Sequence, residues 1–134
     1  MNIAIIAQDR KKELAIQMCI AYCGILSKHY ICATATTGKM ITEATGLKVD
    51  CLLPGEIGGE QQIAARVAYN EIDLVLIFRD PQEKYSGETE INEILHACDV
   101  NSIPAATNVA TAEVLIQGLA RGDMDWREIV RGTR

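Results

Sequence analysis

The stretch DLVLIF, residues 73–78, decides the fold class. Every residue after the aspartate is apolar, and a continuous apolar run of this length is typical of a parallel strand that is covered on both faces. Shorter apolar runs recur along the chain, and segments with helical spacing separate them. The stretch therefore predicts a buried strand of a parallel sheet.

Outward from this strand, apolar runs predict four more strands, at residues 2–7, 30–35, 49–53 and 103–107. Apolar residues spaced three and four apart predict helices around 14–25, 38–45, 59–70, 91–98 and 112–119. We expect Met40, Ile41 and Ala44 to face inward, and the tail at 122–134 to pack Trp126, Ile129 and Val130 in a short final turn. Alternating strands and helices predict an α/β fold: a three-layer, doubly wound, five-stranded parallel sheet in one domain, 1–134.

Composition narrows the possible partners and the compartment. The 134 residues are 49% hydrophobic with a net charge of -5, which argues against nucleic acid as a partner because phosphate neutralisation needs a basic face. The opening MNIAII is too short and too uncharged for a signal peptide or a membrane span, so we expect a cytoplasmic protein. The cysteines form no CxxC pair or metal-ligand spacing, which predicts buried free thiols: Cys19, Cys23, Cys32, Cys51 and Cys98.

Polar residues follow every predicted strand. Ligands of open parallel sheets bind beyond the carboxyl ends of the strands, so these residues should converge on one site. The residues in question are Gln8 to Lys12, Thr34 to Gly38, the loop at 54–62, Arg79 to Glu90, and Thr107 to Thr111. The two histidines, His29 and His96, lie away from this edge, and we expect structural or solvent roles for them.

TATTGK, residues 34–39, offers three hydroxyls and the N–H groups of a helix start, which suit a phosphate. The P-loop pattern fails at Ala33 and at Met40. The alternative interpretation is that Thr34 simply caps a helix. Lys12 adds a nearby cation, although it could equally belong to a solvated basic surface.

The loop LPGEIGGEQQ, residues 53–62, combines glycines with carboxylates. It lacks the GxGxxG pattern, which weakens a dinucleotide interpretation. Glu60 falls in the first turn of a helix, where the helix dipole favours a carboxylate in any case. That alternative leaves the glycines unexplained. Asp80, which precedes Pro81, has its own alternative as the opening residue of a turn.

Four segments resemble methylglyoxal synthases: TATTGKMITEATGL, PGEIGGEQQ, FRDP and IPAATNVATAE. The resemblance runs in order from NIAIIAQD to the C-terminal WREIVRG. It implies a lyase that converts dihydroxyacetone phosphate to methylglyoxal and inorganic phosphate without a cofactor or metal. The base implied by the resemblance is Glu60. The phosphate ligands that it implies are Lys12, Thr34, Thr36, Thr37 and Gly55.

The chain departs from the family pattern around this site. Gln8 and Gly87 replace histidines, and the resemblance implies that Gln8 is one of the substrate-binding residues. The family glycine, serine and aspartate are here Ala35, Pro54 and Glu60, whereas Lys12, Asp9 and Asp80 are retained and Glu90 takes the place of a second aspartate. Our leading hypothesis is a methylglyoxal synthase with a divergent site, in which Glu60 is the base and Asp80, Asp9 and Glu90 orient the substrate and shuttle protons.

Two alternatives remain open at this point. One is a non-catalytic protein that binds a phosphate ligand, because the fold resembles the allosteric domain of carbamoyl phosphate synthetase. The other is an enzyme acting on another phosphorylated carbonyl compound, because IMP cyclohydrolase shares the fold. The resemblance also implies a homo-oligomer, a hexamer.

Overall fold

The computed structural model describes residues 1–82 and 88–131, without the side chains of 88 and 89. Its strands are β1 (Asn2–Ala7), β2 (Tyr30–Ala33), β3 (Val49–Cys51), β4 (Leu74–Phe78) and β5 (Ala105–Ala106). They form a five-stranded sheet in the order β3-β2-β1-β4-β5, and each pair of neighbours is parallel. The predicted fold class, a doubly wound parallel sheet, is therefore confirmed.

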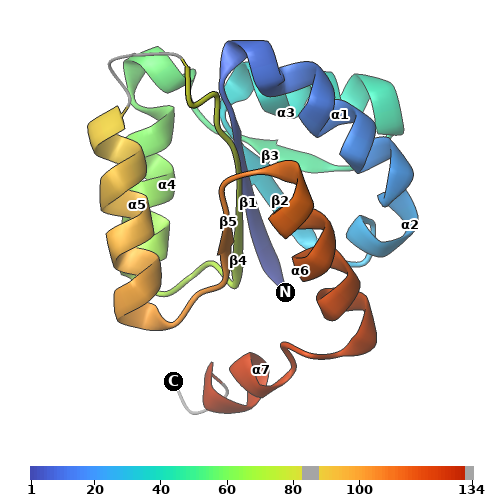
Figure 1. The fold of residues 1–134 in the computed structure, drawn as a ribbon, viewed down its shortest axis with the longest axis vertical. Coiled ribbons are helices and arrows are strands. Elements are labelled where there is room, and N and C mark those ends of the chain that lie inside the picture. Colours follow the sequence, from blue (N-terminus) through green and yellow to red (C-terminus); the bar gives the residue numbers. More distant parts are fainter. Residues whose placement is uncertain (83–87, 132–134) are drawn as a thin grey trace.

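Helices cover both faces of the sheet (Figure 1). One face carries α1 (Lys12–Ala21), α2 (Cys23–Leu26), α3 (Ala35–Thr45) and α6 (Val109–Arg121). The other carries α4 (Gly59–Ala68) and α5 (Glu88–Asn101), which pack against each other. The remaining helical elements are η1 (Asp9–Lys11), η2 (Gly55–Ile57) and α7 (Trp126–Arg131). Among residues 1–82 and 88–131, none of the helices has the length and apolar character that a bilayer-spanning segment needs.

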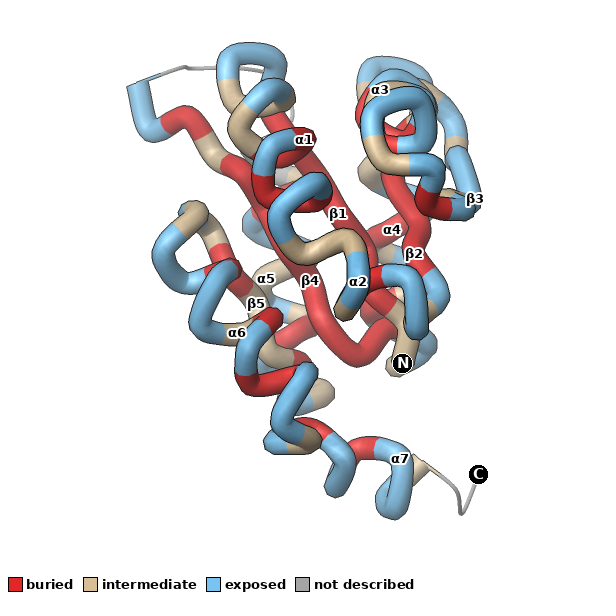
Figure 2. The backbone as a smooth tube through the Cα atoms, turned by 90° about the vertical axis from the view of Figure 1, so that its right-hand side faces the viewer, coloured by how far each residue is buried: buried red, intermediate tan, exposed pale blue. Residues whose placement is uncertain are grey.

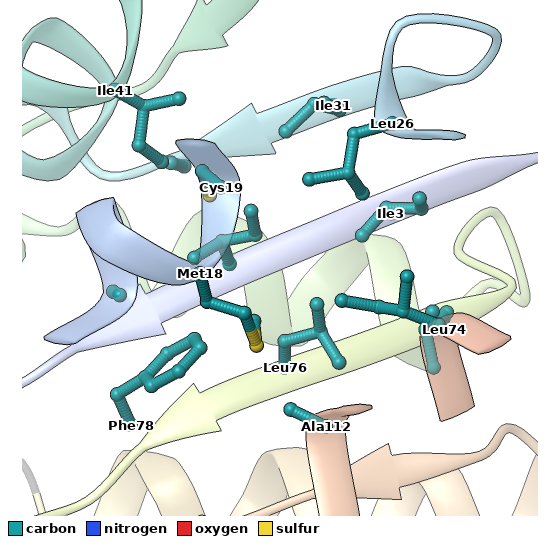
Figure 3. Packing of buried hydrophobic residues seen from close by; sticks show 14 of the residues in the cluster. Ile3, Met18, Cys19, Leu26, Ile31, Ile41, Leu74, Leu76, Phe78 and Ala112 are labelled. Atoms are coloured by element: carbon teal, nitrogen blue, oxygen red, sulfur yellow. The ribbon is translucent and has the colours of Figure 1, made fainter. Parts of the chain in front are cut away.

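The central strands are buried on both faces, as Figure 2 shows for β1 and β4. Leu74, Leu76 and Phe78 point into the cluster beneath α1 and α6 (Figure 3), whereas Val75 and Ile77 point into the cluster beneath α4 and α5. This alternation follows from the side-chain period of two in a strand. It explains why residues 74–78 are apolar without interruption.

The second strand ends earlier, and the helix after it starts earlier, than the sequence predicts. β2 stops at Ala33, and α3 begins at Ala35 instead of Gly38. Thr34 keeps an extended backbone, with φ of -62° and ψ of 156°, and so becomes the N-cap residue. Thr36 therefore lies in the first turn of a helix. Ala44, which the sequence predicts to face inward, is exposed.

Several other predicted elements are longer than the observed ones. The first predicted helix is broken at Tyr22 into α1 and the short α2, and β3 ends at Cys51. α4 ends at Ala68, because Asn70 adopts a left-handed backbone with φ of 57°, a conformation that asparagine tolerates better than most residues. β5 keeps only two of the five predicted residues. These errors concern element ends, where tertiary contacts override local pattern.

The C-terminal segment packs through a different residue than predicted. Trp126, Ile129 and Val130 are exposed, while Arg127 is only 3% exposed. Arg127 donates hydrogen bonds to Ser102 O at 2.7 Å and to the Asp73 carboxylate at 3.2 Å. These contacts fasten α7 below the amino ends of the strands, where Figure 1 places it.

The cysteines are all free, but not all are buried. Cys19, Cys32 and Cys98 are buried, as predicted, whereas Cys51 is exposed and Cys23 is half-buried. Burial raises the pKa of the Cys19 thiol to about 12 and those of Cys32 and Cys98 to about 11. Cys51 departs from the prediction because β3 is an edge strand.

Candidate functional site

The sheet topology predicts a crevice between the carboxyl ends of β1 and β4. From β1 the chain proceeds toward β2 on one side, and from β4 it proceeds toward β5 on the other. Ligands of doubly wound sheets bind where the winding reverses in this way. Gln8 follows β1 and Asp80 follows β4 at this point. Gln8 N donates to Phe78 O at 3.1 Å, and the Gln8 carboxamide oxygen accepts a hydrogen bond from Asp80 N.

The contact between Gln8 and Asp80 fixes the orientation of the Gln8 amide. A backbone N–H is only a donor, so the atom facing Asp80 N must be Oε1, and Nε2 must point the other way. Gln8 is 5% exposed, and its Nε2 is buried without a hydrogen-bond partner among the described residues. Leaving a buried donor unpaired costs about 1–3 kcal/mol. A ligand acceptor would remove that cost.

Asp80 has two different oxygens. Oδ1 accepts from Gln82 N at 3.0 Å, so Asp80 does open a turn, as the alternative interpretation holds. Oδ2 is buried, lacks a hydrogen bond from any described residue, and lies 3.6 Å from Arg10 NH1. A hollow of about 320 Å³ opens here, lined by Arg10, Lys11, Asp80, Pro81 and Gln82. The turn thus leaves one carboxylate oxygen available at the crevice.

Lys12 is held in a fixed position next to this crevice. Its Nζ donates to Ala7 O at 3.0 Å and to Asp9 Oδ1 at 2.9 Å, and its side chain is only 18% exposed. An ammonium has three donors, so one remains for a ligand. The Asp9 side chain is 90% exposed. Its described contact therefore makes Asp9 an anchor for Lys12.

The threonine segment forms the start of α3. Thr34 occupies the N-cap position, as one alternative predicts, but its side chain makes no capping hydrogen bond. Thr37 is fully buried, and its Oγ1 has no partner in the part of the chain that is described, whereas Thr36 is exposed. The first N–H groups of a helix have no acceptor within that helix. The start of α3 therefore offers hydroxyl and amide donors that suit an anion.

The glycine loop lies directly against this threonine segment. A Cβ on Gly59 would be 2.0 Å from Leu53 O and 2.9 Å from Thr34 Cγ2, so only glycine fits. Ala35 N also donates to Leu53 O at 3.3 Å. A Cβ on Gly55 would lie 3.6 Å from Glu60 Oε1. The Glu60 carboxylate therefore lies beside Gly55, at the junction of the loop with α4.

Glu90 joins the site from α5. Its Oε1 accepts from Gln61 Nε2 at 3.2 Å, and its Oε2 is buried with no hydrogen-bond partner in the described ranges. Gly87, which replaces a family histidine, lies outside the described residues. The contacts of Gln61, and those of Gln62 with Leu53, are features that sequence reasoning missed. A glutamine near a helix start carries no chemical signal of its own.

A larger hollow lies elsewhere and contains none of the predicted site residues. It measures about 950 Å³ and is formed by α2, the start of β2, the end of α3, and β3. No unpaired buried polar side-chain atom found in the described residues belongs to its lining. No three His, Cys, Asp or Glu side chains gather as a metal site within 1–82 and 88–131. The crevice between β1 and β4 therefore remains the candidate site.

Comparisons with known proteins identify the family of this chain. The family model "MGS-like domain" matches residues 18–107. The methylglyoxal synthase of Caldicellulosiruptor saccharolyticus is 58% identical over 97% of this chain and 92% of its own length, and that of Thermoanaerobacter pseudethanolicus is 55% identical over 96% and 98%. The crystal structure of methylglyoxal synthase from Elizabethkingia anophelis matches with a TM-score of 0.80 and 35% identity, over 86% of this chain and 76% of that chain. The chain belongs to the methylglyoxal synthase family.

Proposed function

We propose that this single domain, residues 1–134, is a methylglyoxal synthase, a lyase that converts dihydroxyacetone phosphate to methylglyoxal and inorganic phosphate without a cofactor. The observation that carries the proposal is a set of buried polar atoms without hydrogen-bond partners among the described residues: Gln8 Nε2, Thr37 Oγ1, Asp80 Oδ2 and Glu90 Oε2. They come from four different elements or strand ends at one edge of the sheet. The names of the relatives support the choice of reaction.

In this proposal the phosphate group binds at the start of α3. Lys12 supplies a positive charge, and the helix dipole together with the first-turn N–H groups favours an anion. The hydroxyls of Thr34, Thr36 and Thr37 provide further donors. Gly55 lets the loop backbone approach the phosphate, because no side chain occupies that space.

Glu60 is the proposed base. It removes a proton from the carbon on the far side of the ketone from the phosphate ester. The resulting enediolate breaks the carbon–oxygen bond to phosphate, and the enol that remains tautomerises to methylglyoxal. The substrate and the two products balance without an oxidant or water. The Glu60 carboxylate lies beside Gly55, one of the proposed phosphate ligands, and this position supports the role.

Gln8 is the proposed donor to the ketone oxygen, where negative charge develops. Its Nε2 is already oriented by Asp80 N–H, so no reorganisation is needed during the reaction. Asp80 and Glu90 each keep a buried oxygen without a hydrogen bond from the described residues, and we assign them proton transfer with the substrate hydroxyl and the leaving phosphate. Asp9 acts through Lys12. Gln8, unlike a histidine, supplies its donor without titrating.

The test is an assay of the purified protein with dihydroxyacetone phosphate that follows methylglyoxal and phosphate together. Glu60→Gln should lower kcat by about 100- to 10,000-fold while phosphate still raises the melting temperature, because an amide cannot accept the proton. Glu60→Asp should also lower kcat, since the pocket accommodates the longer chain. Glu43→Gln, an exposed position on α3, is the control. Phosphate binding without any turnover would instead favour the non-catalytic alternative.

We also propose a homo-oligomer, the hexamer implied by the family, and a cytoplasmic location. Trp126, Ile129 and Val130 expose apolar surface on one short helix, which contact with another copy would cover. The free cysteines are typical of a reducing compartment. Light scattering that gives a monomer at micromolar concentration would exclude the oligomer.

A further inference from the structure

Two consecutive glutamines of α4 reach from the proposed base to opposite sides of the site. Gln61 Nε2 donates to Glu90 Oε1 on α5 at 3.2 Å, and Gln62 Oε1 accepts from Leu53 N at 2.8 Å. Adjacent helix positions point roughly 100° apart, so one turn can contact both sides. We propose that Gln61 and Gln62 are positioning residues that hold Glu90 and the loop at 53–59 in place around Glu60. This inference rests on the proposed function.

Gln62 binds the loop at the point where the chain leaves the sheet. Leu52 N donates to Ala33 O at 2.8 Å, and this is the last hydrogen bond that continues the pairing of β3 with β2. The next amide, Leu53 N, is bound by Gln62, and the carbonyl of the same residue accepts from Ala35 N. Leu53 is therefore bound on one side by α4 and on the other by the start of α3.

The position of Leu53 sets the position of Gly55. Pro54 O accepts from Ile57 N at 3.1 Å and from Gly59 N at 3.0 Å, which makes a compact turn between Leu53 and α4. Gly55 lies in this turn, beside the Glu60 carboxylate. A shift at Leu53 is thus transmitted to the phosphate-binding backbone and to the base together. A displacement of about 1 Å in a reacting geometry can cost about 100-fold in rate.

Gln61 contacts the opposite side of the site, at α5. Its hydrogen bond occupies Oε1 of Glu90, and Oε2 stays buried and unpaired among the described residues. The Gln61 contact thereby determines which oxygen of Glu90 remains for the substrate. Since Glu90 lies near the start of α5 and Gln61 lies in the first turn of α4, the contact also ties these two helix ends together.

The decisive comparison for Gln62 is between leucine and glutamate. Gln62→Leu removes the acceptor for Leu53 N, whereas Gln62→Glu keeps a carboxylate oxygen in that place. We expect the leucine variant to lose about tenfold in kcat/KM with dihydroxyacetone phosphate and to weaken inorganic phosphate binding, measured by the melting temperature, and the glutamate variant to retain both. Hydrogen exchange of the Leu53 amide, followed by NMR, should accelerate about tenfold in the leucine variant only. Gln17→Leu, at an exposed position of α1, is the matched control.

For Gln61→Leu we expect a drop in kcat of about tenfold with unchanged phosphate binding, because the described contact of Gln61 is with Glu90 and not with a proposed phosphate ligand. Equal Leu53 exchange in Gln62→Leu and the wild type would overturn the assignment of Gln62, whether or not the protein is active. Unchanged kcat in Gln61→Leu would overturn that of Gln61. A wild type inactive on dihydroxyacetone phosphate would refute the proposed function instead, and faster Leu53 exchange with weaker phosphate binding in Gln62→Leu would then still support a positioned loop.

Discussion

Gly59→Ala should push the loop at 53–59 away from the start of α3, where the proposed phosphate site lies. The added Cβ would lie 2.0 Å from Leu53 O, and an ordinary contact begins at 3.4 Å, so the carbonyl must move by about 1.4 Å. The second contact, at 2.9 Å to Thr34 Cγ2, blocks an escape toward α3. Overpacking of this kind costs about 1–3 kcal/mol. For a chain of this size, that corresponds to a drop of roughly 3–12 °C in melting temperature.

The displaced loop carries Gly55 and adjoins Glu60, so kcat/KM should fall by about 100-fold or more. Melting curves with and without inorganic phosphate would measure stability and binding together, and the coupled product assay would measure turnover. Gly24→Ala is the matched control, because a Cβ there meets nothing within 4 Å. A Gly59→Ala variant that melts, binds phosphate and turns over like Gly24→Ala would refute the close approach.

Three further predictions follow from named contacts. Lys12→Ala should reduce the rise in melting temperature that millimolar phosphate causes, whereas Lys39→Ala, at an exposed position of α3, should leave it unchanged. Burial acts to raise the pKa of Asp73, but hydrogen bonds from Arg131, Asn2 N and Arg127 outweigh it and hold that pKa below its ordinary value. The stabilisation from Asp73 is therefore complete above about pH 3.9, the unfolded pKa, and is lost as the pH falls through the lower folded pKa. The melting temperature of Asp73→Asn should thus lie well below that of the wild type at pH 7, and the difference should shrink below about pH 3.9. A difference that stays constant with pH would contradict this. A thiol reagent at pH 8 should label Cys51 first and leave the three buried thiols, with pKa values of about 11 to 12, unreacted until unfolding, as mass spectrometry would detect.

Local sequence patterns account for the layers of the fold and indicate the edge of the sheet at which the candidate site lies. The uninterrupted apolar run at 74–78 could satisfy only a strand buried on both faces, and the alternation of strands and helices required parallel pairing. The apolar run and the alternation of strands and helices are both visible in the local order of apolar and polar residues, without knowledge of contacts between distant segments. The motifs around Lys12, Thr34 and Glu60 likewise indicated the phosphate and base positions through their resemblance to a family, and the structure brings the threonine segment and the loop beside Glu60 into contact.

Contacts between segments far apart in the chain determine how individual side chains are bonded and packed. The Nε2 donor of Gln8 faces away from Asp80 because Asp80 N, 72 positions along the chain, donates to the oxygen of the same amide. Gly59 must be glycine because Leu53 and Thr34 come within contact of it. Arg127 is buried where it donates a hydrogen bond to Asp73, which lies 54 positions earlier in the chain. Contacts across such separations depend on how strands are ordered in the sheet, and no periodicity within a segment records that order. The sequence therefore indicated a candidate site, and the packing of distant segments gave the side chains around it their orientation.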